Sequence, residues 1–160
     1  MLNNATMIAS DTISAALAEC YATIEGRRYN LMQAINLEAK FDKTKVKVPI
    51  LGKTGKGNKA TGWSGTGSAK FHFNTSIFRQ MMLLYKNTGR DIYFEMQISN
   101  EDDTSSVGRQ TIILIGCNID GGILAKFDAD GDYLDEDMNF TFEDFSMPES
   151  FAAMNGLITN

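Results

Sequence analysis

A long segment rich in glycine and lysine separates two stretches in which apolar and polar residues alternate. The segment covers residues 52–67 and contains six glycines. Apolar side chains recur at every second position before it, over residues 35–41, and again after it, over 69–73. Alternation with a period of two is typical of half-buried β-strands. The sequence therefore predicts two strands, 35–50 and 68–74, that pair across a long loop.

The glycines make this predicted loop costly to order, because glycine loses more backbone freedom on folding than any other residue. Loops longer than about 12–15 residues inside a compact domain are usually functional or disordered. We expect the loop to be mobile in the free subunit and to become ordered by contacts outside the monomer. The residues assigned to this assembly loop are Gly52, Lys53, Lys56, Lys59, Trp63, Gly65 and Gly67.

Length and composition favour one globular domain. The chain has 160 residues, of which 43% are hydrophobic, enough for a single core. No window approaches the roughly 18 apolar residues of a membrane helix, and no basic region precedes the mildly apolar N-terminus. We expect a protein kept in a cytosol-like compartment. Cys20 and Cys117 lie in apolar surroundings without a CxxC pattern, which predicts buried free thiols.

Charge is divided unevenly along the chain. Residues 1–100 carry 13 basic and 7 acidic groups, whereas residues 101–160 carry 2 basic and 13 acidic groups. The first part therefore has a formal charge of +6 and the second -11, which add to the net charge of -5. Solvated faces explain such runs equally well. The alternative is that the basic loop of one copy meets the acidic region of the next, as in a head-to-tail assembly.

One segment changes from the strand period to the helix period. Apolar residues over 75–87 recur at helical spacing, a threonine or serine can cap the start, and Gly89 follows the end. We predict an amphipathic helix whose apolar stripe packs against the sheet. The predicted core-facing residues are Ile77, Phe78, Met81, Met82 and Tyr85.

The rest of the chain is predicted to be mostly β. A hairpin is expected about Glu25-Gly26, and alternating or continuous apolar runs predict further strands. The expected strands lie at 21–24, 28–32, 92–98, 112–115, 123–127 and 140–142, the last of the chain.

Two patterns that resemble ligand-binding motifs are incomplete. Gly52-Lys53-Thr54 lacks the earlier glycine and the following helix of a phosphate-binding loop. Asp128, Asp130 and Asp132 alternate as in a calcium loop, but glycine and glutamate are missing at the required positions, so they are only weak metal candidates. The single histidine, His72, excludes zinc sites that need two or more histidines, and its place on the polar face of a predicted strand favours an ordinary surface residue. We expect no enzyme activity, no cofactor and no metal.

The order of these elements resembles the tail tube proteins of the XkdM-like family, which occur in contractile phage tails and phage-derived tail-like particles. The resemblance extends over roughly residues 11–149. Its pieces, in order, are a hairpin, a long strand, TGWSGTGSAKFHF (61–73), TSIFRQMMLLYKNTG (75–89), DIYFEMQIS (91–99) and FTFEDFSMPE (140–149).

This resemblance implies a mainly β fold, a β-sandwich or small barrel with one flanking α-helix. We expect a tail tube domain (13–150) between an N-terminal arm (1–12) and a C-terminal tail (151–160). The resemblance also implies a structural protein whose hexameric rings stack into the inner tube of a contractile tail, a conduit for DNA or other cargo. Its expected partners are itself, sheath, baseplate and tail terminator proteins, with DNA only passing through and no membrane. The expected location is the virion tail or a tail-like particle, assembled in the host bacterial cytoplasm.

Two alternatives remain open at this level. The first is a ring-forming tube protein of the type VI secretion kind, with the same fold and different partners. The second is a single-stranded nucleic-acid-binding module that uses the lysines of residues 40–59, with Trp63 and Phe71 as stacking platforms.

Overall fold

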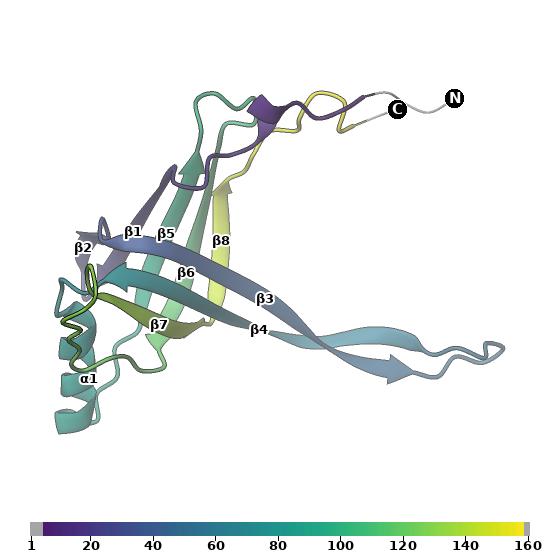
Figure 1. Cartoon of the computed structure of the whole chain (residues 1–160). Coiled ribbons are helices and arrows are strands. Elements are labelled where there is room, and N and C mark those ends of the chain that lie inside the picture. The colour runs from purple at the N-terminus through teal and green to yellow at the C-terminus, as the bar shows by residue number, and fades with distance from the viewer. Residues whose placement is uncertain (1–4, 159–160) are drawn as a thin grey trace. The chain divides into compact units, whose positions relative to one another are not determined.

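The computed structural model describes residues 5–158, which form two compact units (Figure 1). The first unit comprises the described parts of Met1–Met32, Phe94–Ile115 and Phe145–Asn160. The second comprises Gln33–Tyr93 and Gly116–Asp144. Each unit is built mainly from antiparallel strands, as the alternation in the sequence predicts.

In the first unit, the strand order is β2 (Arg27–Asn30), β1 (Ala18–Ile24), β5 (Phe94–Glu101) and β6 (Arg109–Ile119), and β8 (Asp144–Glu149) also pairs with β6. Glu25 and Gly26 both have positive φ, 49° and 80°. Positive φ at both central positions defines the two-residue hairpin turn that matches strand twist, so the predicted hairpin is confirmed.

Apolar side chains at alternate or every third position fill the core of this unit. Met96 and Leu114 are almost completely buried, and so is the polar pair Ser99 and Thr111, whose hydroxyls lie 2.9 Å apart. Cys20, on β1, is half-buried, and burial raises the pKa of its thiol to about 11. Its thiol therefore stays protonated near neutral pH.

Asp102 connects the loop after β5 to the N-terminal segment. Its carboxylate accepts hydrogen bonds from the Thr104 hydroxyl (2.6 Å), the Ser14 amide (3.0 Å) and the Thr104 amide (3.0 Å). These hydrogen bonds hold the pKa of Asp102 below its usual value, and the bond from the Thr104 hydroxyl has the largest effect. Nearby, the Ser106 hydroxyl donates to Asp11, at the end of the short 3₁₀ turn η1 (Ala9–Asp11). The first four residues of the predicted N-terminal arm (1–12) lie outside the described range.

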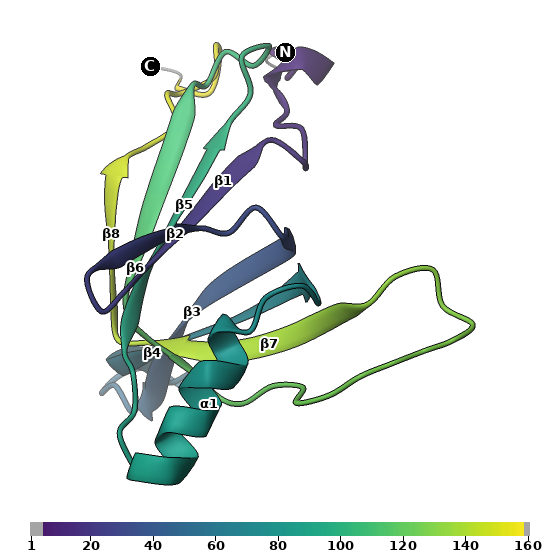
Figure 2. The ribbon, with the colours of Figure 1, turned by 90° about the vertical axis from the view of Figure 1, so that its left-hand side faces the viewer.

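In the second unit, β4 (Gly57–His72) lies between β3 (Ala34–Val48) and β7 (Asp135–Phe142). The last residues of β6, Asn118 and Ile119, pair with Thr141 and Phe140 of β7. The helix α1 (Ile77–Thr88) packs against this sheet, with the Phe78 ring 5.0 Å from the Phe71 ring (Figure 2).

The predicted helix is confirmed, but not all of its predicted core residues are. Phe78 and Met81 are buried, and Ile77 and Met82 are half-buried. Tyr85 is 58% exposed, so its predicted burial is wrong. The buried residues of α1, Phe78 and Met81, both lie in the first half of the helix, so its second half is less covered.

The predicted strand over residues 123–127 is also wrong. This segment lies in the loop between β6 and β7, where Leu124 and Phe127 are 71% and 90% exposed. The three alternating apolar residues match the period of a strand, but they pair with none of the strands that the structure describes. Hydrogen bonds from side chains hold this loop in place instead.

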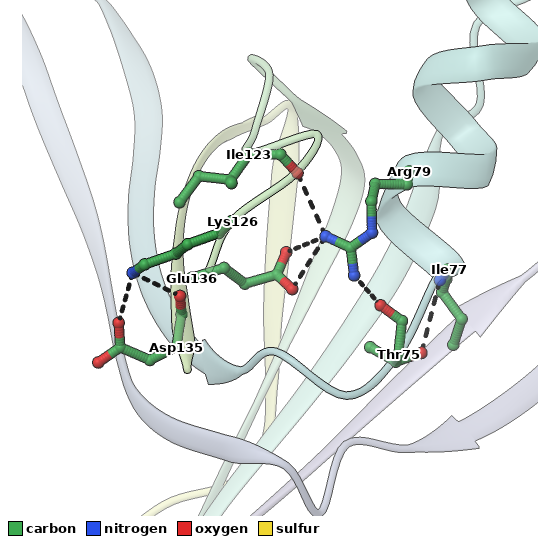
Figure 3. A network of polar contacts seen from close by, with 7 residues as sticks. All are labelled: Thr75, Ile77, Arg79, Ile123, Lys126, Asp135 and Glu136. Atoms are coloured by element: carbon green, nitrogen blue, oxygen red, sulfur yellow. Dashed lines mark hydrogen bonds and ion pairs between the residues drawn. The ribbon is translucent and has the colours of Figure 1, made fainter. Parts of the chain in front are cut away.

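Arg79 of α1 is the main anchor of this loop (Figure 3). Its guanidinium donates to both carboxylate oxygens of Glu136 at 3.3 and 3.2 Å, to the Ile123 carbonyl at 3.2 Å and to the Thr75 carbonyl. Lys126 further along the loop donates to the carbonyl (3.0 Å) and carboxylate (3.2 Å) of Asp135. The Glu136 side chain is only 3% exposed, so Arg79 neutralises a buried charge.

The mainly β class with one α-helix in the described part of the chain is confirmed, and the antiparallel sheet is open in each unit. The strand β8 was not predicted, because all its residues are exposed and it contains Pro148, which sheets tolerate mainly at edges.

Candidate functional site

The β3–β4 hairpin has two parts that differ in their neighbours. In the part nearest α1, β4 pairs with β3 on one side and with β7 on the other, over Gly65–His72. We call this three-stranded part the base. Beyond Gly65, the two strands pair only with each other as far as the Val48–Gly57 pair. We call residues 42–64 the arm, which Figure 1 shows as a long projecting ribbon.

The predicted long loop over residues 52–67 is therefore mostly strand. The connection between β3 and β4 covers only residues 49–56, and Gly57 to Gly67 belong to β4. Glycine is poor in strands because of its backbone entropy, but it is used where another group approaches the backbone closely. The prediction failed because it read every glycine in the segment as a sign of a loop.

Gly65 and Gly67 provide such close approaches in the base. A Cβ atom on Gly67 would lie 2.2 Å from the ring of Phe140, and one on Gly65 would lie 2.4 Å from the ring of Phe142. Each glycine stands opposite its phenylalanine in the register of β4 and β7. The rings thus lie on the glycine backbone and are 1% and 6% exposed. These two assembly-loop residues belong to the core of the second unit.

An aromatic cluster marks the point where the arm leaves the base. The rings of Phe41 and Trp63 stack at 4.6 Å, and the Trp63 ring lies 6.2 Å from that of Phe142. Phe142 is buried, whereas Trp63 and Phe41 remain 38% and 44% exposed. Large aromatic side chains that are half-exposed at such a junction are typical of interface anchors.

The two faces of the arm differ in chemistry. Side chains alternate along a strand, so Lys43, Lys45 and Lys47 share the face of Phe41. Val46 and Val48 follow the opposite face, and a register shift between the pairs of Thr44 and Lys45 marks a bulge in the arm. Lys59 stands opposite Val46, whereas Lys53 and Lys56 lie in the tip with Gly52.

The base presents a polar face opposite its core. By register, this face carries Ser68 and Thr66 on β4 and Asn139 and Thr141 on β7, all exposed. Its lysines are paired: Lys40 lies 3.4 Å from Glu38, and Lys70 lies 3.9 Å from Asp137 and 4.0 Å from Asp135. The face is therefore hydrophilic without an excess of positive charge.

The structure does not gather the weak metal candidates. Asp128 accepts the Asp130 amide at 3.1 Å in an exposed turn that also holds Asp132. Within residues 5–158, no cluster of three or more His, Cys, Asp or Glu side chains could hold a metal ion. His72, half-buried, lies 5.3 Å from the ring of Tyr133, and Cys117 is buried as predicted.

Sequence reasoning identified Trp63 but missed the phenylalanines of this site. Phe140 and Phe142 were assigned only to a strand, and Phe41 only to an alternating pattern. The available signal was the matching two-residue spacing of Gly65 and Gly67 and of Phe140 and Phe142. That match sets each glycine opposite one phenylalanine on two neighbouring strands of the same sheet.

One family model and two known proteins match most of this chain. A family model described as phage tail tube protein matches residues 5–149. The XkdM protein of the phage-like element PBSX of Bacillus subtilis (strain 168) is 39% identical over 115 residues, which cover 72% of this chain and 78% of that protein. The YqbM protein of the same organism, an uncharacterized protein, is 40% identical over 112 residues, 70% of this chain and 76% of that one.

Two solved assemblies contain chains of similar fold. A chain of the sheath–tube complex of an extracellular contractile injection system in its extended state aligns with a TM-score of 0.65 at 8% identity, over 89% of this chain and 94% of that one. A chain of the anti-feeding prophage baseplate aligns with a TM-score of 0.64 at 11% identity, over 88% and 97%. Among the described residues, no helix has the length and apolarity to cross a membrane.

Proposed function

Because this chain belongs to the phage tail tube protein family, we propose that its copies form hexameric rings that stack into the tube of a contractile tail or tail-like particle. A structural role in a tail tube follows from the membership itself and confirms the resemblance found in the sequence. The ring, its stacking and the passage of DNA or other cargo are the proposal. Family members are structural proteins, so we infer no catalytic role.

The observation that carries the proposal is the arm. A two-stranded hairpin alone in water is marginally stable at best. Every side chain over residues 42–47 and 58–64 is exposed, and β3 has β4 as its only partner strand in the second unit. Natural proteins rarely leave a long edge strand unpaired. Contacts with neighbouring copies in a ring and a stack would cover both the edge and the arm.

The solved assemblies that contain chains of similar fold suggest which symmetry and which partners to expect for this chain. The anti-feeding prophage baseplate is described as 6-fold symmetrised, and the injection system as a sheath–tube complex with a sheath/tube terminator. We infer that this chain likewise forms a six-membered ring and meets sheath, baseplate and terminator proteins. Assembly in the cytoplasm of the host bacterium is part of the same inference.

The polar face of the base is proposed to line the lumen. Ser, Thr and Asn side chains on β4 and β7 give a hydrophilic wall, and the ion-paired lysines leave little charge to hold phosphates. A wall with unpaired lysines would bind DNA instead of letting it slide. The opposite, aromatic face is already occupied by the core of the unit.

Electron microscopy of the purified chain tests the assembly. We expect tubes of stacked six-membered rings from the parent chain. The matched variant shortens the arm by joining Lys43 to Trp63 through an Asn-Gly turn, which suits a two-residue hairpin. It should melt like the parent but form no tubes. Monomeric parent protein at high concentration, or normal tubes without the arm, would contradict the proposal.

Amide exchange adds a second measurement on the same samples. The arm amides should exchange fast in the free subunit and slowly in the tube, because only neighbouring copies protect them. The base amides should be protected in both states. Equal protection of the arm in both states would mean that assembly does not order it.

Size-selective labelling tests whether the polar face of the base lines the lumen. In a Cys20→Ser background, Ser68→Cys should react with both a small maleimide and a bulky polymer maleimide in the free subunit. In tubes, only the small reagent should reach it. Cys117 is buried and contributes little background. Equal reaction with the bulky reagent in tubes would place this face outside the lumen.

A further inference from the structure

A hollow of about 360 Å³ lies beside the last turns of α1 in the second unit. Its apolar walls come from Met81, Met82 and Tyr85 of α1 and from Ile92 and Ile119. Its volume lies in the range of about 300–1,000 Å³ that is typical of binding clefts.

The hollow has an acidic border and nothing in the second unit fills it. Asp91 and Asp120 are the only charged residues that line it, and both are exposed. Tyr85 was predicted to be a core residue, yet it stands 58% exposed at this site. An apolar depression with two carboxylates at its border fits an apolar side chain flanked by cations.

The tip of the arm has that chemistry. Leu51 is fully exposed, and Ile50 beside it is 42% exposed. Lys53 and Lys56 follow within five residues, and residues 43–64 contain no acidic side chain. A leucine without any cover at the end of a long ribbon is an unusual use of an apolar residue unless it contacts a partner.

The tip cannot reach the hollow of its own chain. Ile119, which lines the hollow, pairs with Phe140 of β7. Phe140 stands opposite Gly67 of β4, and Gly67 pairs with Ala39 of β3. From Ala39, β3 runs nine residues further to Val48, which at about 3.3 Å per residue carries the tip roughly 30 Å away. Tip and hollow are therefore two separate surfaces of the same chain, an arrangement that generates head-to-tail contacts between copies.

We propose that Leu51 at the arm tip of one copy inserts into the hollow beside α1 of another copy, with Lys53 and Lys56 facing Asp91 and Asp120. The inference rests on the proposed tube and names the two surfaces that join its subunits. It assigns the half-exposed face of α1 to an interface between copies.

Cross-linking tests the contact directly. In a Cys20→Ser background, the variant Leu51→Cys/Tyr85→Cys should give a ladder of covalent oligomers when assembled tubes are treated with diamide, which oxidises two thiols to a disulfide. The matched control, Leu51→Cys/Asp137→Cys, has its second thiol on the polar face of β7 and should give none. Mass spectrometry identifies the linked residues.

Charge exchange gives a second, independent readout. Lys53→Glu/Lys56→Glu and Asp91→Lys/Asp120→Lys should each raise the concentration needed for tubes by roughly tenfold, since exposed pairs are individually weak. Combining all four substitutions in one chain should restore assembly. The parent chain is the control for both.

The outcomes separate the two levels of inference. Tubes without a 51–85 cross-link, or with a 51–137 cross-link instead, would overturn the docking and leave the tube standing. Absence of rescue by the combined charge exchange would also overturn it. A parent chain that forms no tubes at all would overturn the docking and the proposed function together.

Discussion

The base and the arm of the β3–β4 hairpin are made by the same two strands, yet they have opposite relations to the rest of the molecule. In the base, the glycines of β4 lie under the rings of Phe140 and Phe142, which are almost fully buried. In the arm, side chains on both faces are exposed, including Val46 and the lysines. The strand pairing is continuous across the boundary.

This contrast shows that strand pairing alone does not tell where a sheet is stable. A third strand and a covered face turn the base into core, whereas the arm depends on partners that lie outside the chain. Substitutions in the base should therefore reduce the free energy of unfolding, and those in the arm should reduce assembly. Substitutions along the hairpin and its third strand test that division.

The largest effect is expected for the ion pair that anchors the loop before the base strand β7. Glu136→Ala should lower the free energy of unfolding by about 3–5 kcal/mol, because Arg79, 18% exposed, would lose its buried partner. Urea unfolding measures the change. The double variant Arg79→Met/Glu136→Leu should recover much of the loss, and a loss below about 1 kcal/mol for Glu136→Ala would refute the role of the pair.

The next effect distinguishes glycines along the same strand. Gly67→Ala should cost about 1–3 kcal/mol, because the new Cβ would overlap the Phe140 ring. Gly62→Ala, in the arm, meets nothing within 4 Å and is the matched control. It should be neutral or stabilise by up to about 1 kcal/mol through reduced chain entropy. Equal costs at both positions, measured by urea unfolding, would remove the distinction between base and arm.

A smaller effect is expected at the junction of the two parts. A double-mutant cycle with Phe41→Ala and Trp63→Ala should give a coupling energy of about 0.2–1 kcal/mol, as for cross-strand aromatic pairs. The same variants should impair tube formation more than their stability loss explains. Normal tubes from Trp63→Ala would show that the cluster supports the hairpin only.

The smallest effect is expected at Asp102, which lies outside the hairpin and serves as a reference for substitutions in the base and the arm. Asp102 has a lowered pKa in the folded state, so its charged form stabilises the first unit above its ordinary pKa of 3.8, and this stabilisation is lost as pH falls through the lower folded value. The difference in unfolding free energy between the parent and Asp102→Asn should thus be largest near neutral pH. It should shrink on acidification, and a difference that grows in acid would contradict the hydrogen bonds seen.

Local patterns predicted many of the elements of this protein. The alternation over 35–41 and 69–73, the helical period over 75–87 and the Glu25-Gly26 turn all correspond to observed elements. These signals depend on neighbours within a few residues, which a sequence displays directly. The order of elements was also enough to identify the family.

The candidate site was predicted only in part, because its decisive contacts join distant residues. Gly65 and Gly67 looked like loop residues until Phe142 and Phe140, more than 70 positions later, were placed opposite them. Tyr85 matched the helix stripe, yet the last buried residue of α1 is Met81. Whether an apolar side chain is covered depends on where other segments stop, which local spacing does not record.

The sequence by itself determined the mainly β class, the amphipathic helix α1, the division of charge along the chain and the family. The tertiary structure decided which glycines serve as core positions, where the hairpin becomes an arm, and that Arg79 and Glu136 form a buried pair. The physical reason is that periodicity and turn chemistry are local, whereas burial is the outcome of long-range pairing. A residue acquires its energetic role only when strands distant in the chain are placed side by side.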